Sequence, residues 1–245
     1  MSTSLLIPIT TAVVTGVFAV MVFARYQSRG GWHLFAWGVG LALYSIGAAA
    51  QAFLFGGFNE FMFKVWYWAG AVAVAPWLGQ GTIFLLVRKK NWAWISFWLV
   101  TVLSIIGLGM VFLAGVDPTA YQPGVDLTEQ FREIFTATGG AKAARTILVI
   151  FLNTYGTIFL VGGAIYSAFI FWRKRMLVHR MWGNILIAVG GLLPALGGFF
   201  ILLGNPAFKY AGQLLGGVLL FAGFLLATQD APQRDQHPAA VEGDI

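Results

Sequence analysis

The chain has 245 residues, of which 59% are hydrophobic and only 10% are charged, and its formal net charge is +6. A soluble domain has roughly 25% charged residues, so this composition is typical of a membrane protein. The remaining polar sequence is too short for an additional soluble catalytic or DNA-binding domain. The basic residues border apolar runs, where they act as topology signals and lipid-headgroup contacts, so no nucleic-acid partner is expected. The absence of cysteine excludes disulfides and thiolate chemistry.

Seven long apolar runs predict seven membrane-spanning helices, because about 20 apolar residues are needed to cross a bilayer. The expected spans are Leu5–Arg25, His33–Phe55, Phe61–Val87, Trp92–Gly115, Arg145–Trp172, Met181–Gly204 and Phe208–Thr228. Arg25 and Arg29 follow the first run and no basic residue precedes it, which argues against a cleaved signal peptide. The predicted fold class is an all-α bundle of seven transmembrane helices, forming one domain over residues 1–229.

Basic residues occupy every second gap between the runs and predict the orientation of the chain. They follow the first, third and fifth spans, at Arg25 and Arg29, at residues 88–90, and at residues 173–180. Because Lys and Arg favour the cytoplasmic side, we expect an outer N-terminus and a cytoplasmic C-terminus. The expected location is a cytoplasmic (inner) membrane. Interfacial belts are expected from the tryptophans near both sets of gaps, namely Trp32, Trp66, Trp68, Trp92, Trp94, Trp172 and Trp182.

The gap from 116 to 144 is long and contains a helix signal of its own. Asp126 is a candidate N-cap with Glu129 three residues later, and apolar residues then recur on one face. We expect a short amphipathic helix over about 127–137, ended by Gly139 and Gly140. It either fills the gap between two spans at the interface or covers an outward-facing pocket. The polar tail at 230–245 is expected to be disordered and cytoplasmic.

Spans one to three and spans five to seven run in the same direction, and some of their residues match at an offset of 145. Trp37 matches Trp182, and Lys64 matches Lys209. This pattern suggests a 3+1+3 arrangement with parallel repeats, which small transporters use to form a site between the triplets. The alternative is coincidence, because apolar helices with Trp and Lys at their ends resemble one another.

Glycines at regular intervals predict close packing between spans six and seven. The residues concerned are Gly183, Gly190, Gly197 and Gly204 on span six, and Gly212 and Gly216 on span seven. Small residues let helix backbones approach closely in lipid. The alternative use of this stripe is a homodimer contact. Pro76 and Pro194 are expected to bend their helices.

The spans carry few residues that could perform chemistry. None contains Asp or Glu, which argues against proton-coupled transport, and the middle of the last span has no lysine for a retinal Schiff base. His33, His179 and His237 have no companion ligands that would suggest haem or a metal. We therefore expect no catalytic residue, no metal site and no cofactor.

Neutral polar residues inside the spans are the remaining candidates for a site. Those predicted at similar depth in the outer third are Gln51, Asn153, Thr154, Tyr155 and Gln213. Gln80 and Asn184 are predicted in the inner third. Buried amides in lipid usually form hydrogen bonds between helices. The alternative is that the outer group lines a pocket for a small uncharged or apolar ligand.

Three short segments, Ala36–Gly38, Tyr67–Gly70 and Pro76–Thr82, carry a resemblance to known proteins. The stretch Ala36–Trp94 resembles uncharacterised bacterial seven-helix integral membrane proteins and, loosely, the membrane sensor region of some histidine kinases. The chain has no kinase domain, so the resemblance implies that any sensing would require a separate partner. It implies no functional residue.

These observations favour a receptor-like or accessory membrane protein that binds a small neutral or lipidic ligand or a partner's membrane helix. The alternatives are a small-molecule facilitator without proton coupling and a structural subunit of a membrane complex. The expected partners are the lipid bilayer and either a membrane protein or a second copy of the chain.

Overall fold

The computed structural model describes residues 3–87, 89–174, 178–202 and 207–228. Its long helices are α1 (Thr3–Arg29), α2 (Trp32–Leu54), α5 (Lys90–Phe112), α7 (Gly139–Arg173), α8 (Val178–Leu202) and α9 (Ala207–Ala227). A further long helix is divided into α3 (Glu60–Trp66), a π-helical segment η1 (Tyr67–Ala73) and α4 (Val74–Leu86). Two short helices, η2 (Pro118–Ala120) and α6 (Leu127–Ile134), lie in one loop. The described residues form no strand beyond an isolated bridge between Val116 and Phe135.

Six helices in the described residues are long and apolar enough to cross a membrane, which indicates an integral membrane protein. They are Leu5–Arg29, Trp32–Leu54, Glu60–Leu86, Asn91–Phe112, Gly139–Arg173 and Tyr210–Ala227. Large apolar side chains point outward from them, as lipid contact requires; Val20, Trp98 and Ile147 are all more than 60% exposed. The expected sixth span overlaps α8, but residues 203 and 204 at its end lie outside the described residues.

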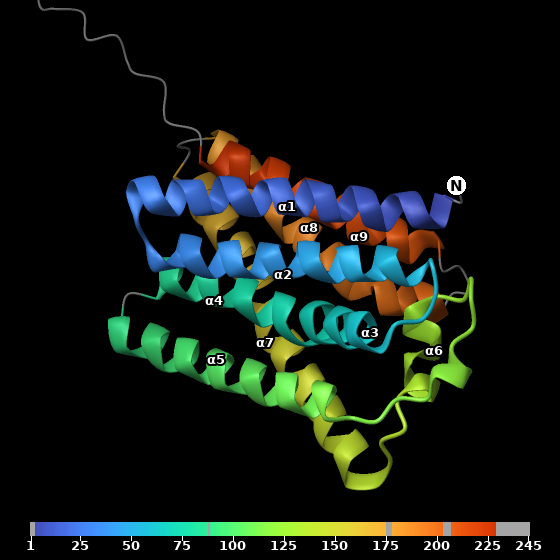
Figure 1. The fold of residues 1–245 in the computed structure, drawn as a ribbon. Coiled ribbons are helices and arrows are strands. Elements are labelled where there is room, and N and C mark those ends of the chain that lie inside the picture. Colours follow the sequence, from blue (N-terminus) through green and yellow to red (C-terminus); the bar gives the residue numbers. More distant parts are fainter. Residues whose placement is uncertain (1–2, 88, 175–177, 203–206, 229–245) are drawn as a thin grey trace, which may run out of the picture.

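Six of the long helices pack in a ring, and α5 lies outside it. Around the ring, α1 packs against α2, α2 against α4, α4 against α7, α7 against α8, α8 against α9, and α9 against α1. α5 packs against α4, η1 and α7, in each case less extensively than neighbouring helices of the ring pack together. Figure 1 shows α5 along one side of the bundle. The ring encloses the space in which the candidate site lies.

Side chains from the divided helix attach α5 to the ring through α5 carbonyls. Lys64 Nζ donates to the carbonyl of Phe112 at 3.0 Å and pairs with Glu60 Oε1 at 2.6 Å. Trp68 Nε1 donates to the carbonyl of Ser104 at 3.0 Å, and Gln80 Nε2 to that of Ala93 at 2.9 Å. The three contacts lie at the two ends and the middle of α5, so they fix its position along its whole length.

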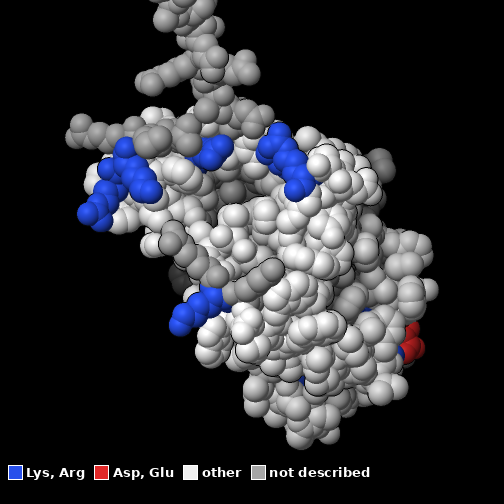
Figure 2. Space-filling model, turned by 90° about the vertical axis from the view of Figure 1, so that its left-hand side faces the viewer, with Lys and Arg blue, Asp and Glu red and all other residues white. Residues whose placement is uncertain are grey.

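The two ends of the bundle differ in charge. We call the end that carries the loop 113–138 the loop end, and the opposite end the basic end. Among the described residues the basic end has Arg25, Arg29, Lys89, Arg173, Lys174 and Arg180 and no acidic residue. Figure 2 views this end, where blue side chains are spread over the face and acidic atoms show only at one edge. The described acidic residues all lie at the loop end, at Glu60, Asp117, Asp126, Glu129 and Glu133.

The loop end differs from the sequence-based expectation in where its helices begin and end. The short helix α6 ends at Ile134, and Gly139 and Gly140 begin α7 instead of ending the loop helix. The helix that contains span five therefore begins before Arg145, which is only 5% exposed. Its guanidinium lies 3.8 Å from the centre of the Phe135 ring, a cation–π contact that pulls this turn of α7 into the aromatic cluster of the loop. Asp126 caps α6 as expected, and its Oδ1 accepts from the Thr128 amide at 2.6 Å.

The backbones of α8 and α9 approach closely at glycines. A Cβ atom on Gly190 would lie 2.8 Å from the carbonyl oxygen of Gly216, and the reverse distance is the same. Gly183 faces Gly223 in a similar way, and a Cβ on Gly212 would touch the Leu193 carbonyl at 3.4 Å. A side chain at the first two crossings would separate the helices. Gly204 and the surroundings of Gly197 lie outside the described residues.

A second glycine crossing, which the sequence analysis missed, joins α4 to α7. A Cβ on Gly79 would lie 2.9 Å from the Cα and the carbonyl oxygen of Gly156. A Cβ on Gly156 would overlap the backbone carbonyl of Ala75. This crossing brings α7 against the divided helix at its change of register.

We expect Gly156→Ala to destabilise the protein by about 1–3 kcal/mol, because the methyl group must push α7 away from the Ala75 backbone. The measurement is unfolding of the purified protein against the mole fraction of a denaturing detergent. Gly162→Ala is the control on the same helix, since a Cβ there meets nothing within 4 Å. Equal unfolding midpoints for the two variants would show that the crossing is not tight.

Candidate functional site

The divided helix has a local change of register beside a proline. Residues 67–73 are π-helical, and the amide of Val74 bonds to the carbonyl of Ala69, five residues back. The α-helix then resumes, and Pro76 follows two residues later without an N–H. Where the π register changes to the α register, one backbone carbonyl receives no N–H, and Pro76 removes a second donor. The carbonyls of residues 70–72 therefore have fewer backbone donors than an unbroken helix provides. Such carbonyls are tolerated at membrane depth only where protein groups or a cavity satisfy them.

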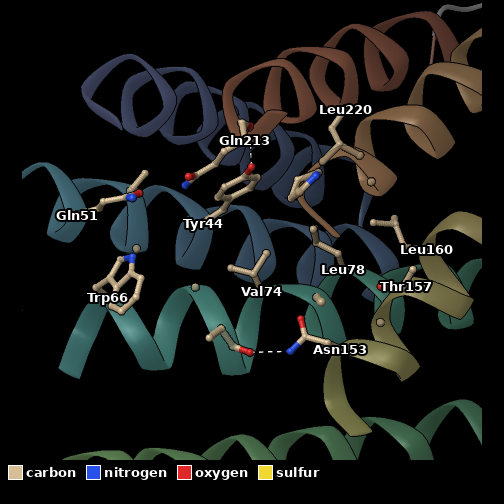
Figure 3. Close-up of a pocket in the computed structure, with 18 of the residues that line it drawn as sticks. Tyr44, Gln51, Trp66, Val74, Leu78, Asn153, Thr157, Leu160, Gln213 and Leu220 are labelled. Atoms are coloured by element: carbon tan, nitrogen blue, oxygen red, sulfur yellow. Dashed lines mark hydrogen bonds between the residues drawn. The ribbon is translucent and has the colours of Figure 1, made fainter. Parts of the chain in front are cut away.

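Asn153 on α7 supplies one of the missing donors. Its Nδ2 donates to the carbonyl of Ala71 at 2.6 Å and to the carbonyl of Val149 on its own helix at 2.9 Å. Both amide protons are therefore used, and the Oδ1 atom points away from these bonds into the bundle (Figure 3). The close approach of α7 at Gly156, one turn further on, makes this contact possible.

A cavity of about 260 Å³ lies inside the ring beside this register change. Five of the six ring helices and the π segment contribute to its wall. Its polar lining groups are Tyr44, Gln51, Trp66, Thr128, Asn153, Thr157 and Gln213. Its apolar and glycine lining includes Gly70, Val74, Leu78, Leu160, Pro194 and Leu220. No described residue with a formal charge lines it, so the cavity offers hydrogen bonds but no ion pair.

Gln51 and Gln213 mark the loop end of the cavity, whereas Asn153 and Thr157 lie closer to the leucines (Figure 3). In Figure 3 the side chains of Gln51 and Gln213 point toward one another at one end, while Leu78, Leu160 and Leu220 lie at the other. Gln51 is 1% exposed; it lies beside the Tyr210 hydroxyl, but neither of its amide atoms has a partner at hydrogen-bonding geometry. A buried amide without partners costs about 1–3 kcal/mol. The end of the cavity at Gln51 is therefore where a bound polar group would gain most.

The loop that contains α6 covers this polar end. Thr128 on α6 lines the cavity, and the Asp126 carboxylate that caps the helix lies against the Tyr210 hydroxyl of α9. On the other side, Tyr121 Oη donates to the carbonyl of Leu54 at the end of α2, at 2.6 Å. Burial raises the pKa of Tyr121, which keeps this donor protonated at neutral pH. The loop is thus attached to helices on two sides of the ring.

The structure brings together three of the five residues predicted for a pocket, namely Gln51, Asn153 and Gln213. Thr154 is exposed on the outside of α7. Tyr155 lies on another face of α7, where its hydroxyl donates to Gln80 Oε1 at 2.6 Å. Gln80 also bonds to α5, so this inner amide connects helices and does not line the cavity. Asn184 bonds to the carbonyl of Arg180 on its own helix at 2.8 Å.

Sequence reasoning missed several lining residues and misplaced one. Trp66 was expected in an interfacial belt, but it is only 9% exposed and lines the cavity just before the π segment begins. Tyr44 was not singled out; its hydroxyl donates to the backbone carbonyl of Gln213 at 2.7 Å and ties α2 to α9 across the cavity. Gly70, six residues before Pro76, was the available signal for an irregular helix facing a cavity.

The described residues contain no cluster of His, Asp or Glu that could hold a metal ion. The arrangement can bind an uncharged molecule by burial and by a few hydrogen bonds. Comparisons of the chain with protein-family models, with curated proteins and with solved structures found no match.

We expect Asn153→Leu to destabilise the protein by about 1–2 kcal/mol, because the Ala71 carbonyl would lose its side-chain donor. Thr154→Val, at the adjacent exposed position, should change stability by less than about 0.5 kcal/mol. Detergent-unfolding midpoints of the two variants give the comparison. An unchanged midpoint for Asn153→Leu would mean that another group satisfies the carbonyl.

Proposed function

We propose that this protein is a receptor-like or accessory integral membrane protein that binds a small uncharged ligand in the cavity between its helices. The observation that carries the proposal is the cavity between the helices, with a buried, unpartnered Gln51 amide at one end. A ligand that offers one hydrogen-bonding group to this end would remove an unfavourable buried amide. The rest of the molecule would be held by apolar contact, at about 25 cal/mol for each Å² buried.

The proposed orientation places the loop end outside and the basic end in the cytoplasm. It is supported by the described basic residues of the basic end and by the acidic residues of the loop end. Under this orientation the polar end of the cavity lies toward the outside, under the α6 loop. The same proposal includes α8 as a seventh span. If the N-terminus is outside and the C-terminal end of α9 is in the cytoplasm, the chain must cross the membrane an odd number of times.

The absence of native cysteine allows this orientation to be tested with single-cysteine variants. Glu133→Cys lies on the exposed face of α6 at the loop end, and Lys89→Cys lies at the basic end. We expect a membrane-impermeant maleimide to label Glu133→Cys in intact cells, and Lys89→Cys only after permeabilisation. The reverse pattern would invert the proposed topology.

Ligand binding can be tested by filling the cavity from a wall residue. A Cβ on Gly70 meets nothing within 4 Å, so Gly70→Leu should place its side chain in the cavity without displacing a helix. Protein would be extracted with its surrounding lipid by a styrene–maleic acid polymer, and bound small molecules identified by mass spectrometry. We expect a compound that is retained by the wild type and by Gly162→Leu, and lost from Gly70→Leu. The same small-molecule content in all three proteins would contradict a ligand in the cavity.

A facilitator of uncharged solutes is the second candidate, and the order of helices around the ring supports it. Around the ring, the triplet α1, α2 and α4 is followed by the triplet α7, α8 and α9, and the helices of each triplet have equivalent neighbours. A 3+1+3 repeat requires this arrangement. The matched tryptophans do not support it, because Trp37 Nε1 donates to the Leu78 carbonyl inside the bundle whereas Trp182 is exposed. In proteoliposomes, glycerol flux that Gly70→Leu abolishes would favour the facilitator over the receptor.

A further inference from the structure

The apolar end of the central cavity is closed by three leucines from three helices. Leu78 on α4, Leu160 on α7 and Leu220 on α9 line both the central cavity and a separate void of about 30 Å³ beyond it. All three side chains are buried, with 5–7% exposure. They therefore form a partition, which we call the leucine floor, between the cavity and this much smaller void.

Glycines on neighbouring helices hold the leucine floor in place. A Cβ on Gly40 of α2 would lie 2.8 Å from a Leu78 methyl, and a Cβ on Gly191 of α8 would lie 3.0 Å from a Leu160 methyl. A Cβ on Gly190 would lie 2.8 Å from the Leu220 amide. Each leucine thus fits against a surface that only glycine provides. On the side away from the cavity, Trp37 fixes the Leu78 turn through its bond to the Leu78 carbonyl, at 3.0 Å.

The distance from the polar end to the floor follows from the helices themselves. Gln213 and Leu220 are seven residues apart on α9, and Figure 3 shows them at the polar end and at the floor. At about 1.5 Å per residue, this is a depth of about 10 Å. An extended chain advances about 1.2 Å per bond, so the space between the amides and the floor suits about eight bonds.

We propose that the ligand is a neutral amphipath with a hydroxyl-type head and one short alkyl chain, and that the leucine floor limits the length of that chain. The inference rests on the proposed function. The head would bond to Gln51 at the polar end, and the chain would run between apolar walls to the floor. Each methylene that fits strengthens binding about fourfold, and the first methylene that meets the floor ends this gain.

The test uses purified protein in nanodiscs and an octanol that carries a photoreactive diazirine. Unlabelled n-alcohols from butanol to dodecanol compete with it, and mass spectrometry locates the adducts. For the wild type we expect adducts on cavity-lining peptides, with competition that strengthens up to about octanol and then levels off or weakens. Leu160→Ala removes three side-chain carbons and should move this cut-off to an alcohol about three carbons longer.

Three variants separate a length-limiting role from a loss of folding. Leu220→Ala opens the floor from another helix and should extend the cut-off in the same way, whereas Leu160→Met keeps the volume and should leave it unchanged. Leu152→Ala is the matched control, because Leu152 is fully buried on α7 but lines neither cavity. Its cut-off should equal that of the wild type.

The outcomes distinguish the two proposals. Absence of cavity adducts in the wild type would overturn both the ligand site and the floor. Cavity adducts with the same cut-off in the wild type, Leu160→Ala and Leu220→Ala would overturn the floor alone and leave the ligand site standing. A cut-off that also moves in Leu152→Ala would attribute the change to general loosening of the bundle and would overturn the floor as well.

Discussion

A backbone carbonyl in the membrane interior must find a donor within the protein, and the candidate site depends on how this is achieved at Ala71. The π segment and Pro76 leave the carbonyls of residues 70–72 short of backbone donors. The donor that Asn153 provides requires α7 to lie against the divided helix, and Gly156 makes that approach possible. Trp66, just before the π segment, and Gly70 within it both line the cavity. The Asn153–Ala71 hydrogen bond thus lies beside both the glycine crossing and the cavity.

The cavity combines a polar end that is not fully satisfied with an apolar end that is rigidly packed. Membrane helices ordinarily satisfy their amides by pairing them across helices, as Gln80 does with Ala93 and Tyr155. Gln51 is equally buried but has no such pairing. The two buried glutamines of the bundle therefore differ: Gln80 connects helices, whereas Gln51 faces the cavity. The leucine floor at the apolar end packs against glycines and has no polar side chain, so it has no comparable unmet hydrogen bond.

Much of the fold was predictable from the sequence, because membrane helices are long apolar runs and their ends carry basic residues. Gln51, Asn153 and Gln213 are amides predicted at similar depth on different spans, and all three line the cavity. Thr154 and Tyr155 do not line it, because neighbours of Asn153 on a helix point in other directions, about 100° apart per residue. The inward position of Trp66 and the crossing of Gly79 with Gly156 lie on either side of the π register. No periodic pattern in the sequence signals that register.

The absence of charge in the cavity lining has a consequence for how occupancy could be controlled. Moving one elementary charge across a membrane potential of 100 mV changes the free energy by about 2.3 kcal/mol. A neutral ligand among neutral side chains moves no such charge, so the potential cannot drive it in or out. Under the proposed function, control would come from ligand concentration or from the covering loop, which bonds to α2 through Tyr121 and contacts α9 through Asp126. The Asp126 that caps α6 also contacts Tyr210 beside Gln51. The stability of the short helix and access to the unpartnered amide are therefore linked through a single carboxylate.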